Sequence, residues 1–334
     1  MSSFGLDIGS HSIKVVELAR DGKNFKLVAS GIAATPQGGL LTESEKTLLE
    51  VSMTIKKLVS DTKVSTKNVV FSLPEQNIYT RVISFPPLAD EEISSAIEWQ
   101  AEGYIPIPKK DAVLDWEVVA RSEKGIEVLL IAAPRTLVDK YMKVVQNSGL
   151  VPVAAETELV ALSRAVAPIS GNALVVDFGA TSTDLAITVN KQLMFVRSIP
   201  TAGAAMTRAV ATSIGVESSQ AEEYKKTYGL SLALEGKVKQ ALNIVVASLI
   251  DEIKKAIGFW KQEHPDYSVQ VGVLTGGTAG LPELIPSITE SLGIEMSIGN
   301  PFSSVNLDQS TSKSLSGYSP LYAIAVGLAM RDLI

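Results

Sequence analysis

The residues with the clearest chemical potential lie just after an apolar segment near the start of the chain. Asp7 ends this segment, and Gly9, Ser10 and Ser12 follow before a second β-branched run begins. This order predicts two strands joined by a tight hairpin, with the acid where the first strand ends. A glycine lets a ligand approach bare backbone N–H groups, which together with serine hydroxyls hold phosphate oxygens. The pattern therefore indicates phosphate binding on a hairpin turn.

The same order of residues returns near the middle of the chain. Asp177, Gly179 and Ser182 repeat the spacing of the first segment, again between apolar runs. A single Asp-x-Gly turn is common and carries little weight, but two copies predict two similar halves. If the halves face each other, both carboxylates enter one cleft, where they can hold the water shell of a Mg²⁺ ion that bridges nucleotide phosphates.

Length and composition limit the classes of protein that fit. The 334 residues, of which 46% are hydrophobic, suffice for two domains with a core in each. The absence of Cys excludes disulfides, thiolate metal sites and thiol catalysis, and the two His leave little for a His-based metal site. A net charge of −6 argues against nucleic acid as a partner, because phosphate backbones are held chiefly by clustered Lys and Arg.

The hydropathy pattern argues against direct insertion into a membrane. The longest apolar stretches, 321–330 and 241–250, are about half of the roughly 20 residues that span a bilayer. The opening residues MSSFGLDIGS show no signal peptide, and the closing residues GLAMRDLI show no basic amphipathic extension. We therefore expect a cytoplasmic protein that reaches a membrane only through a partner.

The elements that must position the two hairpins follow from periodicity and turn residues. In the first half we expect a third strand at 25–33, a helix at 42–60 opened by a capping box of Thr42 and Glu45, and a strand at 69–73. Residues 79–152 differ in texture and predict an inserted α+β subdomain that contains a hairpin over 113–133.

The second half resumes the main fold after this insert. We expect helices at 158–166, 203–214, 218–228 and 238–260, a strand at 269–274, a loop at 299–319 and a last helix at 320–332. The apolar positions of the long helix at 238–260 all lie on one face, which predicts packing on the core. Small residues in the last helix predict close packing at the seam of the two halves.

The order of these parts resembles the actin-like ATPase superfamily. The resemblance rests on the paired Asp-x-Gly hairpins, on the Gly276-Gly277 turn after a strand, and on the closing helix of small residues. It implies an α/β fold in which two duplicated lobes surround a nucleotide cleft. The insert at 79–152 stands in place of the subdomain that actin carries, and in this the chain resembles the FtsA branch.

Within that branch, three further segments resemble the PilM family of type IV pilus assembly proteins. They are RVISFPPLADEEISSAIEWQAEGYIPIP at 81–108, ETELVALSRA at 156–165 and GNPF at 299–302. The resemblance implies a cytoplasmic scaffold, peripheral at the inner membrane, that binds ATP with Mg²⁺ and other pilus assembly proteins. It also implies that a groove between the first lobe and the insert takes the N-terminal cytoplasmic tail of a PilN-like inner-membrane protein. Self-association is compatible with it.

The resemblance also implies a division of the chain and a set of site residues. The first lobe would comprise 1–78, 153–170 and 320–334, with 79–152 as the insert, 171–200 and 269–319 as the second lobe, and 201–268 as a helical subdomain. The residues matched to nucleotide binding are Asp7, Gly9, Ser10, His11, Ser12, Asp177, Gly179, Thr181, Ser182, Glu222, Lys225, Gly276 and Gly277. Of these, Asp7 and Asp177 would hold the metal through water. Without the resemblance, Glu222 and Lys225 would be expected to form a solvated pair on a helix face.

Hydrolysis of a bound nucleotide needs a group that orients the attacking water. Glu158, and less strongly Glu156, lies ahead of the second hairpin at the start of a helix, where related ATPases place such a residue. An acid at a helix N-terminus also complements the helix dipole without any catalytic role. We expect ATP binding with at most slow turnover.

Two other functions and one binding surface complete the hypotheses. A small-metabolite kinase of the same superfamily and an FtsA-like filament protein are the alternatives. For the partner tail, the candidate residues are Ile83, Phe85, Ile97, Tyr104 and Ile105, which are equally consistent with a core of the insert itself.

Overall fold

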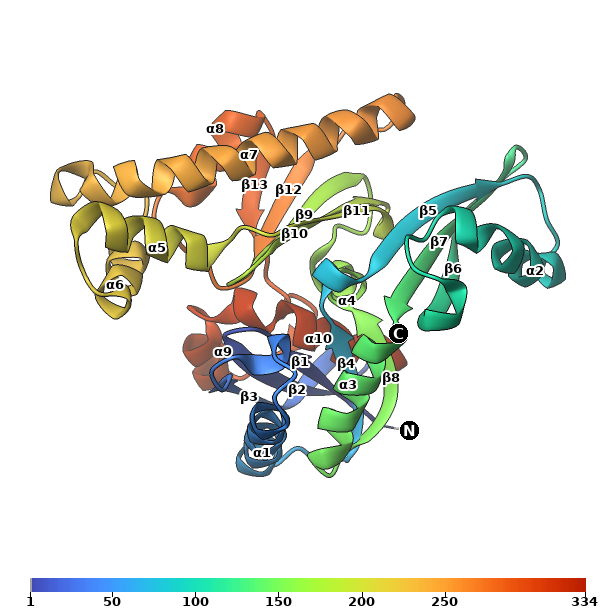
Figure 1. Cartoon of the computed structure of the whole chain (residues 1–334), viewed down its shortest axis with the longest axis horizontal. Coiled ribbons are helices and arrows are strands. Elements are labelled where there is room, and N and C mark those ends of the chain that lie inside the picture. The colour runs from blue at the N-terminus through green and yellow to red at the C-terminus, as the bar shows by residue number, and fades with distance from the viewer. Residues whose placement is uncertain (1) are drawn as a thin grey trace.

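The computed structural model describes residues 2–334, which form two lobes, one above the other in Figure 1, with a smaller subdomain at one side. Each lobe contains one mixed β-sheet with helices packed against it, and the side subdomain has a sheet of its own. We call these parts the first lobe (lower in Figure 1), the second lobe (upper) and the insert.

The first lobe is built on a six-stranded sheet in the order β14-β3-β2-β1-β4-β8. The strands are β1 (Phe4–Ile8), β2 (Ser12–Asp21), β3 (Asn24–Ala34), β4 (Asn68–Leu73), β8 (Val151–Thr157) and β14 (Val305–Asn306). Helices α1 (Glu45–Thr62) and α3 (Arg135–Asn147) share an apolar cluster with β1 and β4. Helix α10 (Ala323–Met330) lies against β1, β2 and α4 (Glu158–Val166), and all of its residues are buried.

The second lobe has a five-stranded sheet in the order β11-β10-β9-β12-β13. The strands are β9 (Asn172–Phe178), β10 (Thr183–Val189), β11 (Gln192–Ile199), β12 (Val271–Thr275) and β13 (Glu295–Ile298). The helices are α5 (Gly203–Ile214), α6 (Ser218–Tyr228), α7 (Lys237–Glu263) and α8 (Leu284–Leu292). As predicted, α7 presents one apolar face to the core, from Val238 to Trp260.

The two lobes repeat one arrangement of strands. In each lobe a hairpin (β1–β2 or β9–β10) is followed by a strand that pairs in parallel with its first member (β4 or β12). The same hydrogen bond closes each turn, from Gly9 N to Ser12 O at 3.1 Å and from Gly179 N to Ser182 O at 3.0 Å. The repeated spacing in the sequence thus corresponds to a repeated local structure.

The insert is a three-stranded antiparallel sheet covered by one helix. Its sheet has the order β5-β7-β6, formed by β5 (Tyr79–Phe85), β6 (Ala112–Ser122) and β7 (Gly125–Pro134). Helix α2 (Asp90–Gln100) packs on this sheet through Ile93 and Ile97. The expected hairpin over 113–133 is therefore present as β6–β7.

Two segments pack in a different part of the molecule from the part to which we expected them to belong. Helix α3 shares the core of α1, so the insert ends near Pro134 and not at residue 152. Strand β8 pairs with β4, in agreement with the expected return to the first lobe at residue 153. Strand β14 pairs with β3 of the first lobe, whereas we expected the second lobe to extend to residue 319. Phe302, Val305 and Leu315 bury their side chains in a cluster with Val16, which explains this attachment.

The start of one helix and the presence of another also differ from expectation. Helix α1 begins at Glu45, and the Thr42 hydroxyl accepts a hydrogen bond from Ser44 N instead of capping the helix. The expected loop at 299–319 contains a short helix, α9 (Gln309–Leu315), capped by Asp308, whose carboxylate accepts from Thr311 N at 2.9 Å. Within residues 2–334, we find no helix that combines the length and the apolar run needed to span a bilayer.

We expect Gly327→Ala to destabilise the protein strongly. A Cβ at this position of α10 would lie 1.8 Å from the Ala161 carbonyl oxygen of α4, so two backbones would have to separate. Overpacking of this kind costs about 1–3 kcal/mol or more, and urea unfolding will measure it. Gly258→Ala in α7, where an added Cβ meets nothing within 4 Å, is the control; it should raise stability by roughly 0.5–1 kcal/mol. Equal midpoints for Gly327→Ala and the parent chain would contradict the close packing of α10.

Candidate functional site

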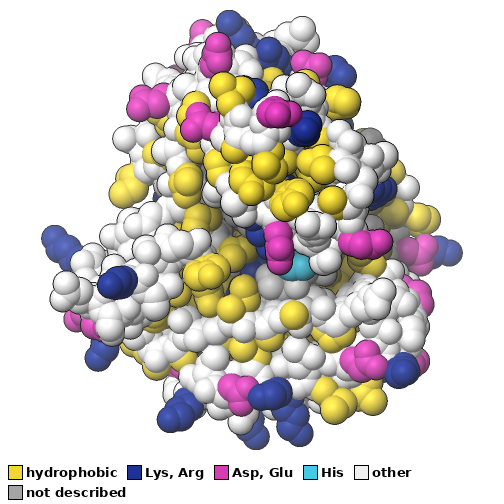
Figure 2. All heavy atoms as spheres, turned by 90° about the vertical axis from the view of Figure 1, so that its left-hand side faces the viewer, with side chains coloured by type: hydrophobic (Ala, Val, Ile, Leu, Met, Phe, Trp, Pro, Cys, Tyr) yellow, Lys and Arg dark blue, Asp and Glu magenta, His cyan; other side chains and the backbone are white. Residues whose placement is uncertain are grey.

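The two hairpin turns meet between the lobes. The Ser10 hydroxyl of the first turn lies 3.0 Å from the Thr181 hydroxyl of the second, which is hydrogen-bonding distance between residues far apart in the sequence. Figure 2 shows a hollow between the upper and lower halves of the molecule. The two turns therefore face one shared cleft, as the duplication predicted.

In the first lobe the acid is paired with a lysine. Asp7 is buried, and its Oδ2 atom lies 2.9 Å from Lys14 Nζ, directly across the β1–β2 hairpin. Ser72 on β4 donates a hydrogen bond to the other oxygen of Asp7 at 3.3 Å. A Cβ on Gly9 would lie 3.0 Å from the Ser12 carbonyl oxygen and 3.2 Å from Lys14 Nζ, so a larger residue would force these neighbours to shift.

In the second lobe the corresponding acid faces another acid. Asp177 lies opposite Asp184 across the β9–β10 hairpin, and Thr275 on β12 donates to Asp177 Oδ1 at 3.3 Å. Burial, followed by the negative charge of Asp184, raises the pKa of Asp177 to about 7, although Lys14 acts in the opposite direction. Burial also raises the pKa of Asp184. This side of the cleft thus carries carboxylates that are costly to ionise without a cation.

Lys14 and Asp184 occupy equivalent positions that sequence reasoning missed. Each follows its hairpin acid by seven residues and pairs with it across the strands. The sequence did contain a signal for them, since each is a charged residue inside an otherwise apolar β-branched run. A charged side chain is rarely buried in such a strand without a partner, so a partner on the neighbouring strand could have been expected.

The acids of the cleft suit a hydrated cation better than a directly ligated one. In the part of the chain that the structure describes, no three His, Asp or Glu side chains converge closely enough to ligate a metal ion directly. Asp7 and Asp177 are contributed by different lobes, and the negative charge of Asp7 contributes to the raised pKa of Asp177. Because Mg²⁺ keeps several of its waters when it binds phosphates, this donor set fits the expected contact through water.

Glu158 lies at the start of α4, close to the same acids. Burial raises its pKa well above the usual range, and the charges of Asp184, Asp7 and Asp177 add to this effect. The Glu158 Oε2 atom accepts a hydrogen bond from the backbone of Glu75 at 3.3 Å, which holds the carboxylate in place.

Glu156 has a different environment from Glu158. Both of its oxygens pair with the Arg164 guanidinium, at 2.7 and 2.8 Å, and Oε1 also accepts from Arg331 at 3.1 Å. These contacts tie β8 to α4 and to the end of the chain, which is a structural role.

Glu222 and Lys225 form a network and not a solvated pair. Lys225 is only 4% exposed, and its ammonium lies 2.6 Å from Glu222, 2.9 Å from the Thr207 hydroxyl and 3.1 Å from the Gly203 carbonyl oxygen. Burial alone would raise the pKa of Glu222, but hydrogen bonds from Lys225 and Thr207 lower it to about 2. The pair thus reaches the N-terminus of α5, where Gly203 N donates to Gly179 O of the second turn at 3.2 Å.

The Gly276-Gly277 turn closes the cleft from β12. Gly276 has φ of 86°, a conformation that favours glycine, and a Cβ there would lie 2.6 Å from Asp177 Oδ1. The next residues hold the second hairpin, since Thr278 N donates to Phe178 O at 3.1 Å.

His11 is exposed in the first turn and Ser12 is half-buried, and His11 O accepts a hydrogen bond from Thr35 N.

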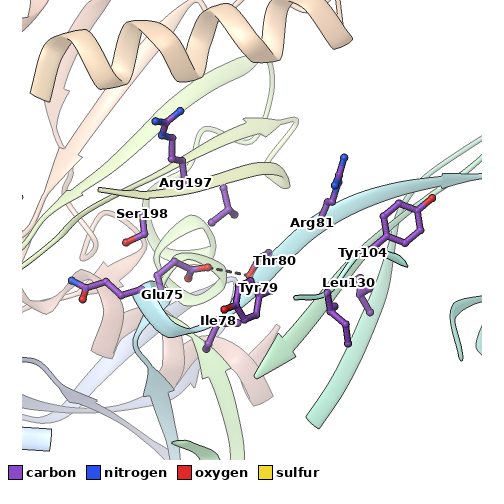
Figure 3. Close-up of a pocket in the computed structure, with 12 residues that line it drawn as sticks. Glu75, Ile78, Tyr79, Thr80, Arg81, Tyr104, Leu130, Arg197 and Ser198 are labelled. Carbon is purple, nitrogen blue, oxygen red and sulfur yellow. Dashed lines mark hydrogen bonds between the residues drawn. The ribbon is translucent and has the colours of Figure 1, made fainter. Parts of the chain in front are cut away.

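The candidate partner residues fall into two groups. Ile83, Phe85 and Ile97 are buried in the core of the insert. Tyr104 and Ile105 line a cavity of about 260 Å³ at the junction of the insert, the segment 75–78 that follows β4 of the first lobe, and β11 of the second lobe. Figure 3 shows this cavity, whose other lining residues are Glu75, Gln76, Ile78, Tyr79, Thr80, Arg81, Leu130, Val196, Arg197 and Ser198.

Comparison with known proteins identifies the family. A family model described as type IV pilus assembly protein PilM matches residues 5–333. This chain belongs to the PilM family. A solved PilM–PilN type IV pilus biogenesis complex contains a chain with a TM-score of 0.88 and 28% identity, with 100% of this chain and 99% of that chain covered. These matches favour pilus assembly over the kinase and filament alternatives.

More distant matches show the fold of this PilM-family chain. The cell division protein FtsA of Enterococcus hirae is 22% identical over an alignment of 343 positions, gaps included, which covers 89% of this chain and 78% of FtsA. EutJ of Carboxydothermus hydrogenoformans matches with a TM-score of 0.59 and 16% identity over 98% of this chain and 89% of EutJ. MreB5 of Spiroplasma citri bound to AMPPNP matches with a TM-score of 0.54 and 13% identity over 98% of this chain and 95% of MreB5. The expected actin-like ATPase fold is confirmed.

The raised pKa of Asp177 predicts a pH-dependent stability. At pH values between the ordinary pKa of 3.8 and the folded-state pKa of about 7, the folded state binds more protons than the unfolded state. The contribution of this carboxyl to stability therefore falls as the pH rises through this interval. We therefore expect the free energy of unfolding of Asp177→Asn, relative to that of the parent chain, to increase by about 1–3 kcal/mol as the pH rises from about 4 to about 8. Urea unfolding without nucleotide or magnesium will measure this difference. A difference that does not vary with pH would contradict the assignment.

Proposed function

We propose that this PilM-family chain is an ATP-binding scaffold that receives the cytoplasmic N-terminal tail of a PilN-like protein at the inner membrane. The observation that carries the nucleotide site is the contact between Ser10 and Thr181, because it brings the two phosphate-type turns into one cleft. The PilM–PilN complex, to which this chain is similar over its whole length, motivates the partner.

The cleft offers groups that match each part of a nucleotide. The backbone and hydroxyls of the turns at 9–12 and 179–182 would hold the phosphates. Asp7 and Asp177 would order the water shell of Mg²⁺, which supplies charge neutralisation between the phosphates. Glu222 and Lys225 would reach the ribose and the adenine edge, and the Gly276-Gly277 backbone would border the adenosine. Because these groups come from both lobes, a ligand that contacts both favours the closed arrangement by its differential affinity.

Glu158 is the group that would orient a water for hydrolysis. Its raised pKa favours the protonated carboxyl until a cation enters the cleft. We assign to the nucleotide mainly the role of a clamp, because groups of both lobes would contact it.

The partner site would be the region around the cavity beside β5. This strand is at the edge of the insert's sheet, so its backbone groups on one side are free to pair with an extended segment. Tyr104 and Ile105 provide an apolar wall beside it, and Arg81 stacks its guanidinium on the Tyr104 ring at 5.6 Å. An extended tail would thus find main-chain partners together with pockets for side chains.

Asp7→Asn should weaken the binding of Mg-ATP. Loss of a carboxylate that orders metal-bound water lowers metal affinity about 10–100-fold, and calorimetry with nucleotide-free protein will measure the effect. The affinity for ATP in EDTA should fall much less, because the hairpin backbone remains. Asp61→Asn, on the exposed face of α1, is the matched control. Equal losses with and without magnesium would count against a metal role for Asp7.

Tyr104→Ala should weaken binding of a synthetic PilN-like tail. The substitution removes one apolar wall of the cavity, and loss of an aromatic anchor typically costs about 2 kcal/mol or more, which is a roughly 30-fold change. Trp99→Ala is the control, since Trp99 is 84% exposed on α2 and does not line the cavity. Fluorescence anisotropy of the labelled peptide measures both. If the two variants bind as tightly as the parent chain, the cavity is not the tail site.

A further inference from the structure

Glu75 lies between the cavity beside the insert and the nucleotide cleft. It begins the short turn Glu75–Asn77 that connects β4 of the first lobe to β5 of the insert. Its side chain is buried, and it lines the cavity. A carboxylate in such a place requires hydrogen-bond partners, because burying an unpaired charge is costly.

On the cleft side, Glu75 and the start of α4 hold each other reciprocally. Leu159 N donates a hydrogen bond to Glu75 Oε2 at 3.4 Å, and Glu75 N donates to Glu158 Oε2 at 3.3 Å. The position of Glu158 in the cleft therefore depends on the position of the turn that begins at Glu75.

On the cavity side, the other oxygen of Glu75 is held by the insert. Thr80 Oγ1 on β5 donates to Glu75 Oε1 at 3.1 Å, as the dashed line in Figure 3 marks. The two carboxylate oxygens thus contact two different parts of the molecule. A shift of β5 at Thr80 would turn the carboxylate, and the bond to Leu159 would then have to adjust.

A row of polar residues connects the same two places through the second lobe. Thr275, Asp177, Asp184 and Ser198 lie in register on β12, β9, β10 and β11. The row begins in the cleft and ends at Ser198, which lines the cavity near Glu75 (Figure 3). Within residues 2–334, Asp184 Oδ1 and Ser198 Oγ are buried and make no hydrogen bond with the protein. The wall between cavity and cleft is therefore polar and incompletely bonded, unlike a packed apolar core.

We propose that Glu75 is a positioning residue that couples the cavity to Glu158, so that an occupant packed against Thr80 on β5 changes the affinity of the cleft for Mg-ATP. The proposal rests on the proposed function, since it takes the cleft as the nucleotide site. It adds a route by which a partner at the insert and a nucleotide between the lobes influence each other, and thermodynamic linkage makes that influence reciprocal.

A covalent probe in the cavity tests the coupling without a known partner. The chain contains no Cys, so Tyr79→Cys introduces a single thiol in the cavity wall. Reaction with benzyl methanethiosulfonate then places a benzylthio group there. We expect the Kd for Mg-ATP, measured by calorimetry, to change by about 5-fold or more on labelling, the lower end of typical coupling between sites.

Second substitutions ask whether Glu75 carries the effect. In the Tyr79→Cys background, Thr80→Val removes the hydroxyl that holds Glu75 Oε1, whereas Thr80→Ser keeps it. Glu75→Gln leaves one acceptor oxygen where two bonds are accepted. We expect the effect of labelling to fall below about twofold with Thr80→Val and with Glu75→Gln, and to persist with Thr80→Ser. A residue with a merely structural role would change the affinity of labelled and unlabelled protein equally.

The control places the same label elsewhere on the surface. Ser213→Cys lies in a shallow groove between α5 and α7 and should leave the Kd unchanged on labelling. An unchanged Kd for labelled Tyr79→Cys, in protein that binds Mg-ATP, would overturn the coupling alone. An effect of labelling that survives both Thr80→Val and Glu75→Gln would overturn the role of Glu75. Failure of the unlabelled protein to bind Mg-ATP would overturn the proposed function and the coupling with it.

Discussion

The ion pair between Lys14 and Asp7 is the interaction on which the rest of the cleft depends. It places one ammonium group beside the acids that both lobes contribute, and its charge opposes the rise in the pKa of Asp177. Asp184 and Glu158 add further negative charge close by. A single lysine cannot balance all of these carboxylates, so under the proposed function a further cation in the cleft would favour the closed contact of the lobes. The electrostatics of the cleft would then link closure, protonation and metal binding.

The two lobes repeat the same hairpin and the same parallel strand, but the repeated parts carry unequal charge. Each hairpin has the same turn bond, and a hydroxyl residue on the next parallel strand donates to each acid, Ser72 in one lobe and Thr275 in the other. The difference lies across the hairpin, where Lys14 stands in one lobe and Asp184 in the other. If both acids faced a lysine, the cleft would be neutral, and if both faced an acid, the carboxylates would repel one another. The unequal pair gives the cleft one side where a lysine neutralises the acid and one side where raised pKa values favour neutralisation by protons or by a cation.

Much of this arrangement could be predicted from the sequence, and the rest depends on contacts between distant segments. The spacing from Asp7 to Ser12 repeats at Asp177, and a repeated local pattern needs no tertiary information. The partners Lys14 and Asp184 could be assigned only from the strand register, which places them opposite the acids. The amphipathic pattern of α3 shows that one face is buried but not which sheet buries it, so the boundary of the insert was misplaced. Likewise, apolar alternation in β5 cannot distinguish a core residue such as Ile83 from one that lines a cavity.

The packing of α10 has a consequence for the order in which the molecule can assemble. A Cβ on Gly5 would lie 2.1 Å from the Ala325 carbonyl oxygen, so the first strand touches the backbone of a helix made at the far end of the chain. Because chains emerge from the ribosome N-terminus first, the face of β1 at Gly5 stays uncovered until Ala325 has been synthesised. The second lobe and the insert, whose strands pair mostly with near neighbours in sequence, have no such delay. The face of the first-lobe sheet that packs on α10 is therefore covered late, whereas the opposite face packs on α1 and α3, which are made much earlier.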